Sequence, residues 1–167
     1  WRGWQGVTPA DGGGKSIELR NAALAHDQGQ NWAPSGPDGG TPGQPNSCYT
    51  SNVGPAIWDV SHSPVLPASG EPAVITACVH DPDGINSVTL LYRLDPSTTT
   101  NTLTLRDDGT SGDSIAGDGI YSGTLSGYSA GTLVAFRIRA IDSASPPRTN
   151  IWPNPALQAE ALVRYGE

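Results

Sequence analysis

The sequence predicts an all-β protein, an immunoglobulin-like antiparallel β-sandwich preceded by an extended segment rich in Pro and Gly. Three observations support this fold class. Apolar and polar residues alternate in several short runs, as they do in strands that bury one face. Turn residues separate these runs at regular intervals. No segment has an apolar stripe at the 3.6-residue period of a helix.

The clearest alternation lies in residues 73–80 and 132–141. Further strands are expected at 88–93, 102–105, 120–125 and 161–164, and the turn sequence DPDG at 81–84 has the pattern of a type I turn. Roughly seven short strands over about 110 residues fit a sandwich. The side chains expected to point inward from the two clearest strands are Ala73, Ile75, Ala77 and Val79, then Val134, Phe136, Ile138 and Ala140.

The first third of the chain differs from the rest in composition and has few alternating segments. Ser16–Arg20 is the one strand expected there, and residues 33–46 are expected to form a loop or linker, because Pro and Gly at this density exclude a helix and a central strand. One strand cannot close a core. We therefore divide the chain into a partial N-terminal segment (1–47), a linker (48–55) and a sandwich domain (56–167).

The net charge of the chain restricts the classes of partner that we expect it to bind. Nine Lys and Arg against sixteen Asp and Glu give a net charge of −7. Such a surface repels nucleic acid and anionic membranes. No run approaches the ~20 apolar residues of a membrane span. We therefore expect polysaccharides or divalent cations as partners, with neither nucleic-acid binding nor membrane insertion. The sequence lacks Met and does not begin with a signal peptide, so we expect a processed or excised piece of a longer chain.

Two cysteines, Cys48 and Cys78, are present. They are compatible with one disulfide in an oxidising compartment or with two buried thiols. Cys78 lies on the outward face of the strand 73–80, where the preceding linker that carries Cys48 could cross over it. We expect the disulfide, and with it an extracellular or cell-surface location.

The most informative local feature is the stretch DDGTSGDSIAGDGIY at residues 107–121. Asp108, Asp113 and Asp118 recur every five residues, with Asp107 beside the first, and the intervening glycines let the backbone fold tightly. Calcium takes six to eight oxygen ligands, which such a loop can supply. We expect these four aspartates to bind a structural calcium ion. The alternative is a hairpin whose Asp side chains cap their own backbone, and the residue types alone leave both open.

Residues 127–131 (GYSAG) match the G-x-S-x-G pattern of a hydrolase nucleophile elbow. That elbow needs a helix after the serine, and an Asp and then a His later in the chain. Here an alternating strand follows, and His26, His62 and His80 all precede Ser129. We expect a hairpin turn at this position and no enzymatic activity.

Trp4, Trp58 and Trp152 are candidate platforms for stacking on sugar rings, provided that they share one open face. The alternative is that the tryptophans fill the ends of the sandwich and the linker. The sequence does not show which aromatic side chains are exposed.

Several short motifs occur together in this chain. They are SIELR (16–20), NWAPS (31–35) and GTPGQPNS (40–47), then SPVLP (63–67), DPDG (81–84), LLYR (90–93), residues 108–121 and FRIRAID (136–142). The first three are similar to the C-terminal end of a bacterial lamin-tail domain, an immunoglobulin-like module of secreted proteins. The later motifs resemble the immunoglobulin- or fibronectin-like domain that follows it, and ALVRYGE at 161–167 is similar to the lead-in to a spore-coat (CotH-type) kinase-like domain.

The resemblance implies a bacterial surface context and no catalytic residue. We therefore expect a non-catalytic structural or interaction module of a secreted or cell-surface bacterial protein, stabilised by calcium, whose partners are other domains of its parent. One alternative is a carbohydrate-binding module that uses the tryptophans. Another is a subunit of an extracellular assembly that pairs with copies of itself through strand edges.

Overall fold

The computed structural model describes residues 10–155 and 158–166, and within these ranges the chain is all-β, with ten strands and no α-helix. This confirms the predicted fold class. The elements in chain order are β1 (Lys15–Leu19), the 3-10 turn η1 (Gly29–Asn31), β2 (Trp32–Asp38), β3 (Ala56–Ser63), β4 (Ala73–His80), β5 (Ile85–Leu94), β6 (Asn101–Leu105), β7 (Ile120–Leu125), β8 (Leu133–Asp142), β9 (Thr149–Trp152) and β10 (Ala161–Arg164).

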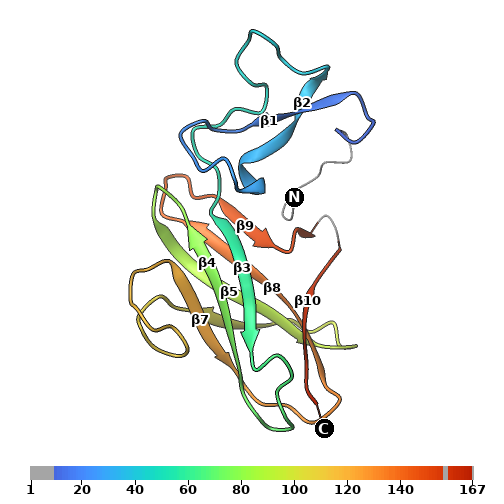
Figure 1. Ribbon diagram of the computed structural model, residues 1–167, viewed down its shortest axis with the longest axis vertical. Coiled ribbons are helices and arrows are strands. Elements are labelled where there is room, and N and C mark those ends of the chain that lie inside the picture. The colour runs from blue at the N-terminus through green and yellow to red at the C-terminus, as the bar shows by residue number, and fades with distance from the viewer. Residues whose placement is uncertain (1–9, 156–157, 167) are drawn as a thin grey trace.

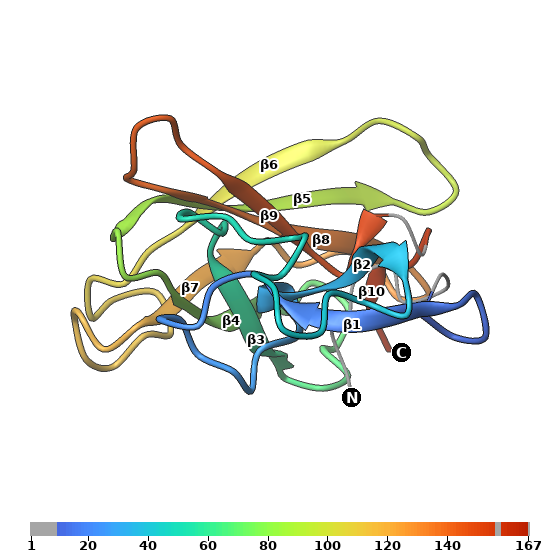
Figure 2. The same cartoon turned by 90° about the horizontal axis from the view of Figure 1, so that it is seen from above.

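Two antiparallel sheets form the sandwich. One has the strand order β3-β4-β7, and the other has the order β10-β8-β5-β6. β9 also pairs with β8. It pairs with residues 138–141 of that strand, whereas β10 pairs with residues 133–136, so β9 and β10 follow one another along the same edge. Figure 2 shows the two layers from one end, with β5, β6 and β8 in one and β3, β4 and β7 in the other.

The core lies between these layers, and its residues occupy alternate positions of each strand. All eight side chains that were expected to point inward from residues 73–80 and 132–141 are at most 2 % exposed. Val88 and Leu90 of β5, with Leu105 and Leu125, belong to the same core. The period-two pattern therefore predicted the inner faces of β4 and β8 correctly, because both strands are central in their sheets and bury one full face.

The sequence predicted the bounds of three strands correctly, the central β4 and the edge strands β7 and β10. Residues 73–80, 120–125 and 161–164 form strands with the predicted bounds, and the other predicted strands of the sandwich shift by one to three residues. β3 and β9 were not among the predicted strands. β3 contains a bulge between Trp58 and Ser61, which interrupts its alternation. β9 has only four residues.

The N-terminal segment contains a second strand that the sequence prediction missed. β1 and β2 form a two-stranded antiparallel sheet at one end of the sandwich, above β3 and β9 (Figure 1). The expected loop at 33–46 is therefore wrong for its first part. Pro34 and Pro37 fit in β2 because each strand of a two-stranded sheet has a free edge, where a missing N–H breaks no ladder hydrogen bond.

Residues 48–55 join the two parts and contact both. Thr50 N donates to Arg20 O at 3.0 Å on the N-terminal side. On the sandwich side, Asn150 Nδ2 donates to Pro55 O at 2.9 Å, and Val53 is buried. In addition, Gln30 Nε2 donates to Ile57 O at 3.0 Å directly from η1 to β3.

The expected disulfide between Cys48 and Cys78 is absent, and both cysteines are free. Cys48 follows the N-terminal sheet and its Sγ donates to Glu18 O at 3.4 Å. Cys78 lies on β4, the central strand of its sheet, where it pairs with Trp58 of β3 on one side and Ile120 of β7 on the other. The linker therefore holds Cys48 on the N-terminal sheet instead of crossing over β4. Burial raises the pKa of both thiols, which keeps them protonated at neutral pH.

The core predicts a large difference between two apolar truncations. Ile138→Ala removes a fully buried side chain at the centre of β8 and should lower the free energy of unfolding by about 2–5 kcal/mol. Leu162→Ala in the adjoining β10 is the control, because Leu162 is 51 % exposed, and its effect should stay within about 0.5 kcal/mol. Urea denaturation measures both values, and similar losses in the two variants would contradict this core.

Candidate functional site

The aspartate-rich loop runs from the end of β6 in one sheet to the start of β7 in the other. Arg106 and Ser122 exchange backbone hydrogen bonds of 2.8 Å at its base, which closes the loop as a hairpin. Gly112 holds the loop against β4: its φ is +103°, and a Cβ at this position would lie 2.1 Å from Cγ1 of Val74. Only glycine fits both the backbone conformation and the close approach.

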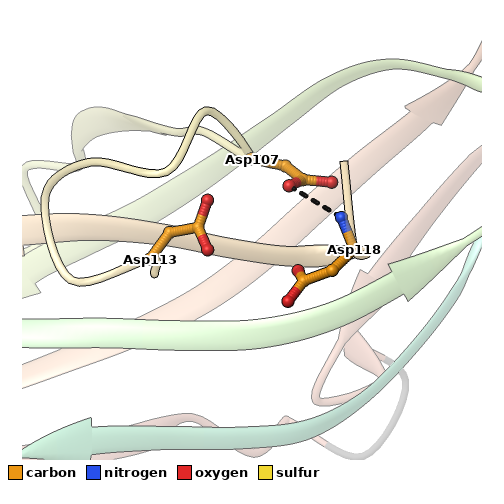
Figure 3. A group of neighbouring side chains, drawn as sticks. All are labelled: Asp107, Asp113 and Asp118. Atoms are coloured by element: carbon orange, nitrogen blue, oxygen red, sulfur yellow. Dashed lines mark hydrogen bonds between the residues drawn. The ribbon is translucent and has the colours of Figure 1, made fainter. Parts of the chain in front are cut away.

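Three of the four predicted aspartates converge in this loop. One carboxylate oxygen from each of Asp107, Asp113 and Asp118 lies within 4.8 Å of the others. Figure 3 shows the three carboxylates around a common space, with the Asp118 N–H directed at Asp107. Asp113 is buried, Asp107 is half-buried and Asp118 is exposed. The group is therefore open to solvent on one side.

The backbone of the same loop holds these carboxylates in place. Asp107 Oδ1 accepts from Gly117 N at 2.6 Å, and its Oδ2 accepts from Gly119 N at 3.0 Å. Asp113 accepts from Gly109 N at 2.6 Å and from Ile115 N at 3.0 Å. These N–H donors stabilise the ionised form and lower the pKa of Asp113.

Asp108 does not belong to the cluster of Asp107, Asp113 and Asp118. Its Oδ1 accepts from Thr110 N at 3.1 Å and from Thr110 Oγ1 at 2.6 Å, so it forms a local turn in an exposed position. The regular spacing of five residues suggested Asp108 as a ligand, but the tight turns of the loop bring its neighbour Asp107 to the centre instead.

The geometry fits both alternatives that the sequence left open, calcium binding and the capping of the loop's own backbone. The Asp side chains do cap their own backbone, as the alternative to calcium binding requires. Each carboxylate oxygen has two lone-pair directions, however, so an oxygen that accepts one N–H can also face a cation. No ion pair among the described residues involves this cluster, so no basic side chain there neutralises its negative charge.

Two of the candidate tryptophans line one cleft. Trp58 on β3 and Trp152 on β9 are half-buried and border a cleft of ≈ 320 Å³, together with Gln28, Gln30 and Asp59. Trp4 lies outside the described residues. The cleft lies where β3 and β9, edge strands of the two sheets, contact one another, and Gln28 and Gln30 of the N-terminal segment border it.

Asp59 has an unusual backbone within this cleft. It lies in the bulge of β3 with a φ of +46°, in the left-handed region that few residues other than Gly, Asn and Asp adopt. A bulge turns a strand's side chains away from their regular directions. The exposed carboxylate is therefore presented beside Trp58 and not on the regular face of the sheet.

A second acidic group was not found from the sequence. Asp81 opens the β4–β5 turn and is 7 % exposed, and Asp142 ends β8 and is 0 % exposed. Burial raises the pKa of Asp81, and the nearby Asp142 carboxylate raises it further. The DPDG turn was visible in the sequence, but nothing local linked it to Asp142.

Ser129 of the GYSAG segment lies in the connection from β7 to β8. Its carbonyl accepts from Thr132 N at 3.1 Å, which forms a turn before β8. The helix that a nucleophile elbow requires after its serine is not present in this described part of the chain.

The pKa of Asp113 predicts a pH-dependent contribution to stability. Because the pKa is lowered in the folded state, Asp113 stabilises the fold above its ordinary pKa of 3.8, and this stabilisation disappears as the pH falls through the lower folded value. We expect the melting temperature in chelator to fall below about pH 4, and to fall less steeply in Asp113→Asn. Asp11→Asn, in an exposed loop, should keep the wild-type slope. Circular dichroism measures these slopes, and identical slopes in all three proteins would refute the role of Asp113.

Comparison with known proteins finds neither a matching family model nor a matching curated protein. Among the described residues, no helix has the length and apolar character needed to cross a membrane.

Proposed function

We propose that this chain is a non-catalytic structural module of a secreted or cell-surface protein, stabilised by a calcium ion bound at Asp107, Asp113 and Asp118. The observation that supports the proposal is the convergence of three carboxylate oxygens within 4.8 Å in one loop, without a basic partner among the described ion pairs. Three like charges at this separation repel one another, and a divalent cation removes that repulsion.

The donor atoms favour calcium over other metals. The cluster offers carboxylate oxygens and no His or Cys, which suits a hard cation and not zinc or copper. Its carboxylates come from a glycine-rich loop, which tolerates the irregular, high coordination of calcium better than the strict octahedron of magnesium. The remaining ligands would be backbone carbonyls and water.

The position of the loop gives the ion a structural role. The loop passes from β6 in one sheet to β7 in the other, and Gly112 packs it on Val74 of β4. An ion that fixes this loop therefore restrains the connection between the sheets. A module of this kind acts by keeping its shape and spacing between neighbouring domains.

We propose other domains of the same parent protein as the partners. The loop between β3 and β4 exposes Val65 and Leu66, which are 83 % and 61 % exposed. Adjacent exposed apolar side chains are a common feature of contact surfaces. The acidic surface and the resemblance to bacterial surface modules agree with an extracellular location.

Calcium should raise the melting temperature relative to chelator. The stabilisation grows with the ratio of free calcium to its dissociation constant and reaches about 2.7 kcal/mol at a hundredfold excess. Asp118→Asn should reduce the rise, and because Asp118 is exposed, the variant should still fold. Differential scanning calorimetry with calcium and with chelator measures both effects.

Asp108→Asn is the matched control, since it removes the same charge from the same loop outside the cluster. This variant should keep the wild-type response to calcium. Equal melting temperatures of the wild type in calcium and in chelator would contradict calcium binding in this loop. Equal responses of the Asp118 and Asp108 variants would contradict it as well.

A second candidate function is the binding of a neutral saccharide in the cleft between Trp58 and Trp152. The observation that favours it is that both indoles line the same cleft, with the amides of Gln28 and Gln30 and the Asp59 carboxylate at its border. Indole faces stack on sugar rings, while amides and carboxylates bond to hydroxyl groups. The negative charge of the chain favours a neutral sugar over an acidic one.

Titration with an array of neutral oligosaccharides tests this function through tryptophan fluorescence. A bound sugar should shift the emission, and Trp152→Ala should abolish the shift. Trp32→Phe, in the N-terminal hairpin and outside this cleft, should bind as the wild type does. No shift with any neutral sugar, or a shift that survives Trp152→Ala, would exclude the cleft as a sugar site.

A further inference from the structure

We propose that Asp81 and Asp142 form a second, buried cation site, at the corner where the β4–β5 turn meets the end of β8, and that this site takes a single calcium ion. The site is separate from the aspartate loop and contributes to the same structural role. Its ligands come from strands of different sheets, because β4 belongs to one sheet and β8 to the other.

The strongest observation is an unpartnered carboxylate oxygen inside the protein. Asp142 is 0 % exposed. Its Oδ1 accepts from Arg148 N at 2.9 Å and from Ala144 N at 3.2 Å, whereas its Oδ2 is buried with no hydrogen-bond partner. A buried carboxylate oxygen without a donor is strongly unfavourable, so such an atom indicates a missing partner.

Asp81 is the neighbour that makes this a candidate ligand set. Ser143 N donates to Gly84 O at 3.0 Å, and Ile85 pairs with Asp142, so the turn is fixed beside the end of β8. Asp81 Oδ1 accepts from Asp83 N at 2.8 Å, which directs the carboxylate within the turn. Its carboxyl group is close enough to Asp142 to experience that charge.

No ion pair among the described residues involves Asp81 or Asp142. Arg148 contributes its backbone N–H, while its side chain is exposed. His80 is close enough for its charge to lower the pKa of Asp81, but its side chain is exposed and forms no ion pair with either carboxylate. Two carboxylates carry two negative charges, and one divalent cation neutralises both. Oxygen ligands select calcium among the common divalent ions for an irregular site.

The corner also supports the N-terminal segment. Asp81 lines a small cavity of ≈ 40 Å³ between the sandwich and the N-terminal segment, together with Gln30 and Val53. An ion at Asp81 and Asp142 would fix the turn that forms one wall of this cavity. The site would therefore stabilise the seating of the N-terminal segment as well as the sandwich.

The experiment separates this corner from the aspartate loop. All variants carry Asp118→Asn, which weakens the loop site. Asp142→Asn is added to this background, and isothermal titration with calcium and melting curves compare the protein before and after the addition. Asp81→Asn is a second added variant, in case Asp142 is needed for folding. We expect each added substitution to remove one calcium ion per chain and most of the remaining thermal response. In chelator, the added variants should be more stable than their parent, because a buried like-charge pair has been relieved.

Two results would overturn the corner site. One is an unchanged calcium response after both added substitutions. The other is the absence of any calcium response in the Asp118→Asn background together with stabilisation by acid, which would show that the two carboxylates share a proton instead of an ion. Conversely, if Asp118→Asn has no effect but the corner variants abolish the response, the loop site fails and the corner site stands.

Discussion

The packing of β4 against β5 and β8 is the constraint on which the rest of the structure depends. Ile75, Leu90 and Ile138 are fully buried between the sheets, and the residues next to each of them along its strand are less buried. Because both sheets face this core, the chain must cross from one to the other at the ends of strands. The crossing from β4 to β5 carries Asp81, and the crossing from β6 to β7 carries the aspartate loop. The acidic groups are thus located by the core, in connections that bridge the sheets.

The same constraint explains why the inner faces of β4 and β8 could be predicted. β4 and β8 each have neighbours on both sides, so one face is buried along the whole strand and the sequence shows a clean period of two. A strand at the edge of a sheet tolerates bulges and prolines more easily, because one of its sides has no neighbouring strand. The bulge at Asp59 shifts the pattern of β3, and β2 accommodates two prolines that normally argue against a strand. Local patterns therefore describe the regular strands of this sandwich, the edge strands β7 and β10 included, better than strands that contain a bulge or prolines.

A candidate site is easier to predict from the sequence when its residues lie close together along the chain. Asp107, Asp113 and Asp118 lie in one loop, so the sequence alone predicted their association, although regular spacing wrongly added Asp108. The turn that carries Asp81 is placed beside Asp142 by the pairing of β5 with β8, and no local motif indicates that placement. The Cys48–Cys78 prediction failed for the related reason that the course of a linker depends on tertiary contacts, here those of Cys48 and Thr50 with the N-terminal sheet.

The two acidic groups are connected through the end of β4. Val79 N donates to Gly119 O at 2.9 Å, which fixes the last part of the aspartate loop to this strand, and Asp81 follows only two residues later. The hairpin β1–β2 rests on the same end of the sandwich through the bond from Gln30 to Ile57 (Figure 1). Ions in the loop and at the corner would therefore restrain one end of the domain from both sides. Since the net charge of −7 opposes compaction of acidic loops, the proposed ions would have their largest structural effect at that end.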